Sequence, residues 1–368
     1  MLREFLARVW RRLVEHVDVP LLLITVAIMV AGLATVFSAT YDANNRLLAQ
    51  ALNMIVGLGA MWAVAQLPPQ KLMRFGVPLY LIGILLLILV YFFGIKVNGA
   101  RRWLSLGFTR IQPSELLKIA VPLMLAWYFH KHEALLRFRH YVIACLLLLL
   151  PFALIAKQPD LGTAILVGAA GFYVIFFAGL PWGVMVGLFA GAAGAAPFVW
   201  TMLHDYQRKR ILTLIDPTTD PLGSGYHIIQ STIAIGSGGS FGKGWLAGTQ
   251  THLEFIPERH TDFILAVFSE ERGLLGNCIL LLLYLLLIGR GLMIAAKAST
   301  LFARVVAGSV TLSLFTYVFV NMGMVSGILP VVGVPLPFMS YGGTALVTLS
   351  VSIGILMSIH SHRMLVRT

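Results

Sequence analysis

The sequence is short of charge and of cysteine. Only 11% of its 368 residues are Asp, Glu, Lys or Arg, and 58% are hydrophobic. Soluble globular chains carry about 25% charged residues, so this composition excludes that class and predicts a protein that crosses a membrane several times. The two cysteines, Cys145 and Cys278, lie inside apolar runs, which excludes a disulfide framework and a cysteine-ligated zinc site.

Acidic residues are scarcer than basic ones. The chain holds 15 Asp and Glu against 27 Lys and Arg, which gives a formal net charge of +12. In a soluble protein this excess would suggest nucleic acid, but here the bases are scattered among short segments between apolar runs. We therefore expect no nucleic-acid partner and predict contacts with membrane lipid or with a phosphorylated substrate.

The apolar runs predict the architecture. A helix that spans a bilayer needs about 20 apolar residues. Ten such runs occur, at residues 19–40, 47–67, 76–95, 115–129, 141–156, 161–179, 183–203, 263–288, 305–328 and 341–360. The expected fold is all-α: one polytopic membrane domain over residues 1–368 with ten transmembrane helices.

The distribution of Lys and Arg predicts the topology. Residues 1–18 form a basic amphipathic segment, and bases are more frequent on its side of the membrane than in the short loops opposite. The positive-inside rule then places the N-terminus and the tail 361–368 in the cytoplasm. The long polar segment 204–262, between the seventh and eighth helices, is expected outside.

One short outer loop is nevertheless basic. It carries Arg101 and Arg102 beside Trp103, and positive charge on the outer side indicates an anionic ligand. The alternative is a loop that touches anionic headgroups, with Trp103 as an ordinary interface aromatic.

Glu115 and Lys118 follow that loop on the fourth predicted helix. They are three residues apart and share one helix face. Each charge alone would cost about 2.5–3.5 kcal/mol in hydrocarbon, so they must pair or line a water-filled cavity. A structural ion pair and a cavity wall both remain open.

Other polar residues are candidates for the same outer site. Lys157 and Asp160 lie in a short outer turn, where Asp160 would also serve as a helix cap. Ser340, Gly342 and Gly343 begin the last helix, whose free amides could hold an anion or simply be capped.

The long polar segment has three features of its own. Arg210 ends a run of three bases, and Lys243 lies in a glycine-rich run, residues 236–244. Because Gly244 and not Ser or Thr follows Lys243, this run is not a P-loop; an amide nest for a diphosphate and a flexible cover are the alternatives. At the far end Asp262 directly precedes an apolar helix, and an acid where water gives way to hydrocarbon requires a reason.

Several separate motifs resemble those of one family. These are Gly99–Trp103, Gln112–Glu115, Gln158–Gly162, Gly225–Ser231, Pro257–Phe263, and the string from Asn321 through Pro330 to Ser340–Ala345. They are similar to the motifs of the SEDS proteins, the shape, elongation, division and sporulation family, and the short termini favour its elongation branch.

The resemblance implies a function and a set of partners. It implies a ten-helix glycosyltransferase of the bacterial inner membrane that polymerises lipid II on the periplasmic side. It also implies a class B penicillin-binding protein and other elongation-complex proteins as partners, and Asp262 as the essential residue.

These expectations combine into one mechanistic hypothesis. Asp262 acts as general base on the acceptor sugar hydroxyl, which attacks the anomeric carbon of the growing strand and expels undecaprenyl pyrophosphate with inversion. We expect no covalently bound cofactor; a divalent cation such as Mg²⁺ or Mn²⁺ is allowed, with no ligand set visible. A lipid II flippase and a non-catalytic scaffold are the alternative functions.

The hypothesis assigns each candidate residue a role. The expected catalytic residues are Asp262, Glu115 and Lys118. The expected substrate-binding residues are Arg101, Arg102, Trp103, Gln112, Ser114, Lys157, Asp160, Arg210, Lys243, Arg259, His260, Ser340, Gly342 and Gly343.

Overall fold

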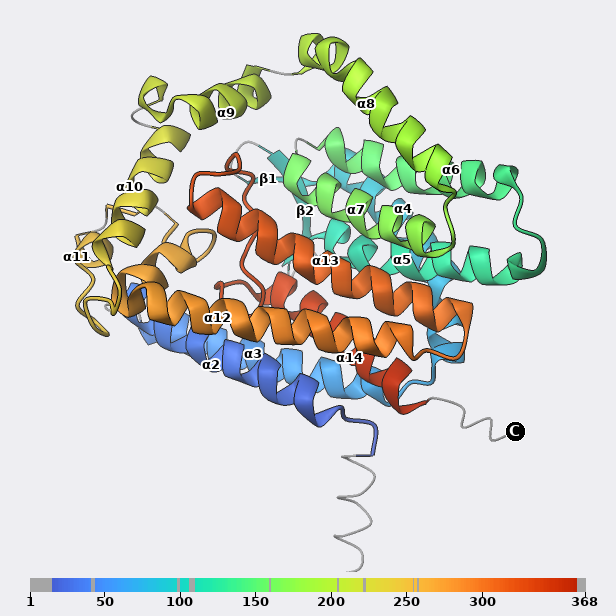
Figure 1. Cartoon of the computed structure of the whole chain (residues 1–368), viewed down its shortest axis with the longest axis horizontal. Helices are drawn as coiled ribbons and strands as arrows, with labels where there is room; N and C mark the ends of the chain where they lie inside the picture. Colours follow the sequence, from blue (N-terminus) through green and yellow to red (C-terminus); the bar gives the residue numbers. More distant parts are fainter. Residues whose placement is uncertain are drawn as a thin grey trace, which may run out of the picture.

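The computed structural model shows a mostly helical protein (Figure 1). It describes residues 15–40, 44–97, 100–105, 110–158, 160–203, 205–220, 223–253, 255–256 and 258–362. The long helices are α2 (Val19–Ala39), α3 (Asn44–Ala65), α4 (Pro69–Phe93), α5 (Pro113–Lys131), α6 (Phe138–Ala156), α7 (Leu161–Phe177), α8 (Trp182–Met202), α12 (Ile264–Ala296), α13 (Leu301–Val325) and α14 (Gly343–Ser361). The predicted amphipathic N-terminus and most of the predicted tail lie outside the described residues.

Each predicted apolar range falls on a long helix, although several boundaries were wrong. Among the described residues, seven helices are long and apolar enough to cross a membrane: α2, α3, α4, α6, α12, α13 and α14. Helix α7 is apolar but shorter, and α5 carries Glu115 and Lys118 in its first two turns. Helix α12 continues well past its predicted end at residue 288, and its Arg290 is paired with the buried Asp18.

Helix α13 lies at the centre of the bundle (Figure 1). It packs against α12, α7, α5 and α14, and α14 packs in turn along α3. Helix α8 runs along the top of the view, and most of its described side chains are exposed.

The end of the bundle that holds the first described residues is closed by ion pairs. The carboxylate of Asp18, at the start of α2, contacts Arg290 of α12 at 2.6 Å and His360 of α14 at 3.2 Å. Burial alone would raise the pKa of Asp18, but the hydrogen bonds from Arg290 and from the Leu21 amide hold that pKa below its usual value. Three helices far apart in sequence are therefore joined at one point.

The basic outer loop contains strands, which the all-α expectation missed. β1 (Ile95–Val97), β2 (Ala100–Ser105) and β3 (Arg110–Ile111) form a three-stranded antiparallel sheet in the order β1-β2-β3. The hydrophobic period did not reveal this sheet because its strands are very short and paired only with each other.

The polar segment 204–262 is largely helical. It contains α9 (Asp205–Ile215), α10 (Ser224–Ser237) and the short α11 (Thr249–His252). Helices α10 and α11 lie beside the first turns of α12 at the left of Figure 1, and α9 lies above them toward α8. Helices α10 and α11 therefore cover one end of the bundle.

Helix α12 is interrupted at Gly273, whose φ of 64° and ψ of −162° are not helical. An unbroken helix would join the Leu274 amide to the Glu270 carbonyl and the Leu275 amide to the Glu271 carbonyl. Instead the two carbonyls accept from the amides of Lys243 and Gly244, at 3.0 and 3.1 Å.

The two freed amides are satisfied by the same glycine-rich run. Leu274 donates to the Gly239 carbonyl at 2.9 Å, and Leu275 donates to the Ser240 carbonyl at 3.0 Å. The glycine-rich run thus provides partners for the two carbonyls and two amides that the break in α12 leaves unpaired. Its backbone is engaged by α12, so it is neither an amide nest for a diphosphate nor a flexible cover. Its glycines are needed because a Cβ on Gly242, which has φ +80°, would lie 2.1 Å from the Glu271 carbonyl oxygen.

We predict that Gly242→Ala destabilises the protein. The new methyl group must displace the backbone of α12, and such strain costs about 2 kcal/mol or more, which corresponds to a fall of roughly 3 °C in Tm for a protein of this length. Thermal unfolding of the detergent-solubilised protein would measure the change.

Gly236→Ala is the matched control. Gly236 lies inside α10 with nothing within 4 Å of the added Cβ, so alanine should be neutral or slightly stabilising. Equal melting temperatures for the two variants would contradict the role of the glycine-rich run.

Candidate active site

Asp262 lies in the turn that leads into α12, where the structure fixes its backbone. Its carbonyl accepts a hydrogen bond from Asn321 Nδ2 at 2.8 Å, and the same nitrogen donates to the Val334 carbonyl at 2.7 Å. Its carboxylate approaches Gly333, where an added Cβ would lie 3.4 Å from Oδ2. The turn, α13 and the loop after α13 therefore meet at this acid.

The electrostatics of Asp262 favour proton transfer. Its side chain is half-buried, and no hydrogen bond or ion pair joins its carboxylate to any residue that the structure describes. Burial raises the pKa of this carboxyl to about 6, and the nearby charge of Glu258 adds to the shift. A carboxylate with a pKa near neutrality is suited to act as a general base.

Several predicted substrate ligands instead hold the turn of Asp262 in place. The Ser340 hydroxyl donates to the Thr261 carbonyl at 2.7 Å, and the Tyr341 amide donates to the His260 carbonyl at 2.8 Å. The Gly342 amide is engaged by Gln50 Oε1 at 3.3 Å. These contacts fix the residues that precede α14.

Two further predicted ligands lie beside this turn. Arg259 Nε donates to the Ala39 carbonyl at the end of α2, at 2.7 Å. Gly343 lies in the first turn of α14, where an added Cβ would approach the Asn53 side chain at 3.1 Å. Both residues connect the turn or α14 to neighbouring helices.

A second polar cluster joins the small sheet to α5 and α7. Asp160 caps α7 by accepting from the Thr163 amide at 3.2 Å, and its other oxygen accepts from Gln112 Nε2 at 3.2 Å. Arg102 of β2 lies 3.7 Å from the same carboxylate. The predicted role of Asp160 as the cap of α7 is therefore confirmed. The same carboxylate places Arg102 beside the start of α7.

Glu115 and Lys118 form a buried ion pair in α5. Lys118 Nζ lies 2.6 Å from Glu115 Oε1 and 5.1 Å from the centre of the Tyr317 ring. The second oxygen of Glu115 is buried without a hydrogen-bond partner in the described part of the chain. Such an orphaned polar atom indicates space for water or for a polar substrate group.

The remaining candidates are more dispersed. Arg101 is exposed on β2 beside the half-buried Trp103, and Ser114 is buried in the first turn of α5. Lys157 is exposed at the end of α6, and Arg210 is half-buried in α9.

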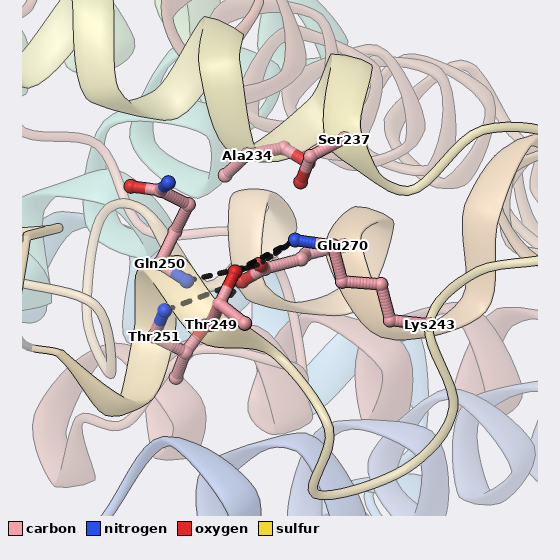
Figure 2. A network of polar contacts seen from close by, with 7 residues as sticks. All are labelled: Ala234, Ser237, Lys243, Thr249, Gln250, Thr251 and Glu270. Carbon is pink, nitrogen blue, oxygen red and sulfur yellow. Dashed lines mark hydrogen bonds and ion pairs between the residues drawn. The ribbon is translucent and has the colours of Figure 1, made fainter.

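Lys243 is drawn into a network that the sequence did not predict (Figure 2). Its ammonium lies 2.8 Å from Glu270, whose fully buried carboxylate also accepts from the amides of Gln250 and Thr251. The network fixes α11 onto α12, which argues against a substrate contact by Lys243.

Sequence reasoning missed four residues that shape the site. They are Glu258, Gln50, Tyr317 and Glu270, described above. Only Glu270 carried a signal, as one of three adjacent ionisable residues in an apolar helix; the others act through contacts between distant segments.

The profile of the FtsW/RodA/SpoVE family, described as cell cycle proteins, matches residues 12–365. This chain belongs to the FtsW/RodA/SpoVE family. The family predicted from the sequence motifs is therefore confirmed.

Individual relatives cover nearly the whole chain. The peptidoglycan glycosyltransferase MrdB of Escherichia coli K12 is 52% identical over 349 residues, which are 95% of this chain and 94% of that protein. A probable peptidoglycan glycosyltransferase FtsW of Geobacter metallireducens is 35% identical over 360 residues, covering 94% and 95%.

Solved structures agree with this assignment. A chain from a peptidoglycan synthase complex, described as coordinating polymerization and crosslinking, aligns with a TM-score of 0.83 at 37% identity, covering 95% of this chain and 98% of that one. The rod shape determining protein RodA of Thermus thermophilus aligns with a TM-score of 0.72 at 32% identity, covering 94% and 97%.

We predict that the Glu115–Lys118 pair obeys the energetics of a buried ion pair. Glu115→Gln leaves a buried ammonium without its counter-charge and should destabilise the protein by about 3–5 kcal/mol, as should Lys118→Met. The double variant removes both charges and should recover most of that loss. Unfolding of all three variants in detergent tests this; additive losses would show that the two residues do not act as a pair.

Proposed function

We propose that this protein is a peptidoglycan glycosyltransferase that polymerises lipid II during cell elongation. The observation that carries the proposal is Asp262, a half-buried acid without a cationic partner among the described residues and with its pKa raised to about 6. Relatives named as peptidoglycan glycosyltransferases, at up to 52% identity over most of the chain, support this activity.

Asp262 supplies the base that the reaction requires. The acceptor sugar 4-hydroxyl gives its proton to the Asp262 carboxylate while its oxygen attacks the anomeric carbon of the growing strand. The bond from that carbon to the diphosphate breaks, and polyprenyl diphosphate leaves from the opposite side with inversion. Arg102, oriented by Asp160, and the exposed Arg101 offset the charge of the leaving group.

A divalent cation such as Mg²⁺ or Mn²⁺ stays a prediction from the sequence. Among the residues that the structure describes, no group of three His, Cys, Asp or Glu side chains lies close enough to hold a metal ion. We therefore assign no metal ligand, and the cationic side chains carry the electrostatic role.

The membrane topology is part of the proposal. We assign spans to α5, α7 and α8 as well as to the seven longer apolar helices, ten in all, with both termini in the cytoplasm. Asp262, Arg102 and α9 to α11 then lie on the periplasmic side of the inner membrane. The distribution of Lys and Arg supports this orientation.

A class B penicillin-binding protein is the proposed partner, within a larger elongation complex. Support comes from the similar chain in a complex that coordinates polymerization and crosslinking. A polymerase coupled to a crosslinking enzyme would deliver each new glycan strand directly to the next step.

Asp262→Asn is expected to abolish most polymerisation. General base catalysis contributes about 10²–10⁴-fold in rate, so glycan synthesis from purified lipid II should fall by that factor. The amide removes the need to bury a charge, so the variant should be no less stable than wild type. Product chains separated on gels measure the rate, with a moenomycin-type inhibitor present to exclude other polymerases.

Each result of that assay has a definite meaning. Near-normal synthesis by Asp262→Asn would remove the general base from the proposal. If wild-type proteoliposomes translocate lipid II but form no polymer, the flippase is favoured. If the wild-type protein neither polymerises nor translocates lipid II but still activates the penicillin-binding protein, the scaffold is favoured.

The pH dependence gives an independent prediction. The base must be ionised, so polymerisation should be lost as pH falls through about 6, well above the ordinary value of 3.8 for an aspartate. Glu258→Gln removes the nearby negative charge, which lowers the pKa of Asp262 and moves the acid limb to lower pH. Glu133→Gln, in the exposed turn after α5, is the control and should leave the profile unchanged.

A further inference from the structure

An apolar groove lies between α7, α13 and the loop that follows α13. Its cavity volume is about 140 Å³, and its lining has no exposed polar surface. The residues that shape it are Gly162, Ile165, Leu166, Val320, Val332 and Val334. Ile165 is 42% exposed, so the groove opens on the surface of the bundle that would face lipid.

The groove shares a wall with the site of Asp262. Val332 and Val334 line the groove, while Gly333 between them lies against the Asp262 carboxylate, 3.4 Å from Oδ2 to an added Cβ. A single short segment therefore separates an ionisable acid from an apolar pocket.

The opposite wall begins at the second polar cluster. Gly162 follows Asp160, which caps α7 and lies 3.7 Å from Arg102. A Cβ on Gly162 would lie 2.6 Å from the Val332 carbonyl oxygen, so α7 and the loop are in direct contact. The groove thus has polar groups at its outer end and only apolar groups along its length.

We propose that this groove binds the first isoprene unit of the polyprenyl chain on the donor, the growing strand whose diphosphate leaves. The inference rests on the proposed function. In the donor, the reacting anomeric carbon carries the diphosphate and then the chain, so that chain must begin beside Asp262. In the acceptor, the reacting hydroxyl is separated from its own chain by a disaccharide, so that chain enters elsewhere.

The size and dryness of the groove fit this occupant. A dry apolar cavity of roughly 150 Å³ takes up benzene in another protein, so this groove holds about one five-carbon isoprene unit. A chain that moves from bilayer to groove leaves one hydrocarbon medium for another and gains little free energy. The groove therefore serves to orient the leaving group rather than to raise affinity greatly.

The experiment uses photolabelling of the full-length protein in phosphatidylglycerol vesicles. The probe is farnesyl diphosphate with a diazirine on its first isoprene unit, and labelled peptides are identified by mass spectrometry. In wild type we expect the label in the first turns of α7 or in residues 329–334. A second arm places the diazirine on a phospholipid acyl chain, which reports whether an ordinary lipid fills the groove.

Ile165→Trp fills the groove and should remove most of the labelling there, because the added side chain leaves no room for the isoprene unit. Ile143→Trp on α6 is the matched control, because Ile143 is also an isoleucine with 42% exposure, and its labelling should equal that of wild type. Ile165→Ala leaves the groove open and should retain labelling. A misfolded tryptophan variant would be recognised by its melting temperature, and the wild-type label map stands without it.

The outcomes separate this inference from the proposed function. Labels elsewhere, equal labelling in both tryptophan variants, or a phospholipid label that the diphosphate probe fails to displace would overturn the groove assignment while wild-type polymerisation continues. Absence of polymer from wild type would instead overturn the proposed function, whatever the label map shows.

Discussion

The structure depends on satisfying backbone polar groups where a membrane helix breaks. At Gly273 the interruption of α12 frees two carbonyls and two amides, and each such group left unpaired in hydrocarbon would cost several kcal/mol. The run from Gly239 to Gly244 pairs with all four groups, so the break becomes a fixed joint. The first half of α12, and with it the turn that carries Asp262, is thereby held against α10 and the helices around it.

Charge pairing explains why Asp262 differs from the other buried acids. Asp18 is paired with Arg290, Glu115 with Lys118, Asp160 with Arg102 and Glu270 with Lys243. Each of these carboxylates lies beside a basic side chain, and Asp18, Asp160 and Glu270 thereby connect segments far apart in the sequence. Burial disfavours the ionised form of Asp262 instead, and its charged neighbour Glu258 adds to this effect. In the proposed mechanism the paired acids stabilise the fold, and Asp262, whose pKa is raised to about 6, accepts the proton.

The sequence predicted what depends on local composition and missed what depends on distant contacts. Ten apolar ranges fall on ten long helices because hydropathy and period are read over neighbouring residues. The contact between Lys243 and Glu270 could not be predicted because the two residues lie 27 positions apart, and the glycine-rich run resembles a phosphate loop until its backbone partners in α12 are known. Asp262 was predicted from its position and the family motif, whereas the shift in its pKa depends on its burial in the fold and on the placement of Glu258. Ser340, which was expected at a substrate, holds the turn that presents the acid, and Gly342 is bonded to Gln50 of α3.

The loop after α13 contacts both the proposed general base, Asp262, and the apolar groove proposed for the lipid chain. Non-helical backbone at membrane depth is tolerated only where protein or water covers it, and here Asn321 and Ser340 hold the loop by hydrogen bonds to the Val334 carbonyl and from the Leu336 amide. So fixed, the segment presents Gly333 to Asp262 and the flanking valines to the apolar groove. A lipid-linked sugar has the same division, with a polar reacting centre beside an apolar chain. If the groove holds the chain, one rigid segment sets the distance between the leaving group and the base, and orientation by the lipid becomes part of the rate enhancement.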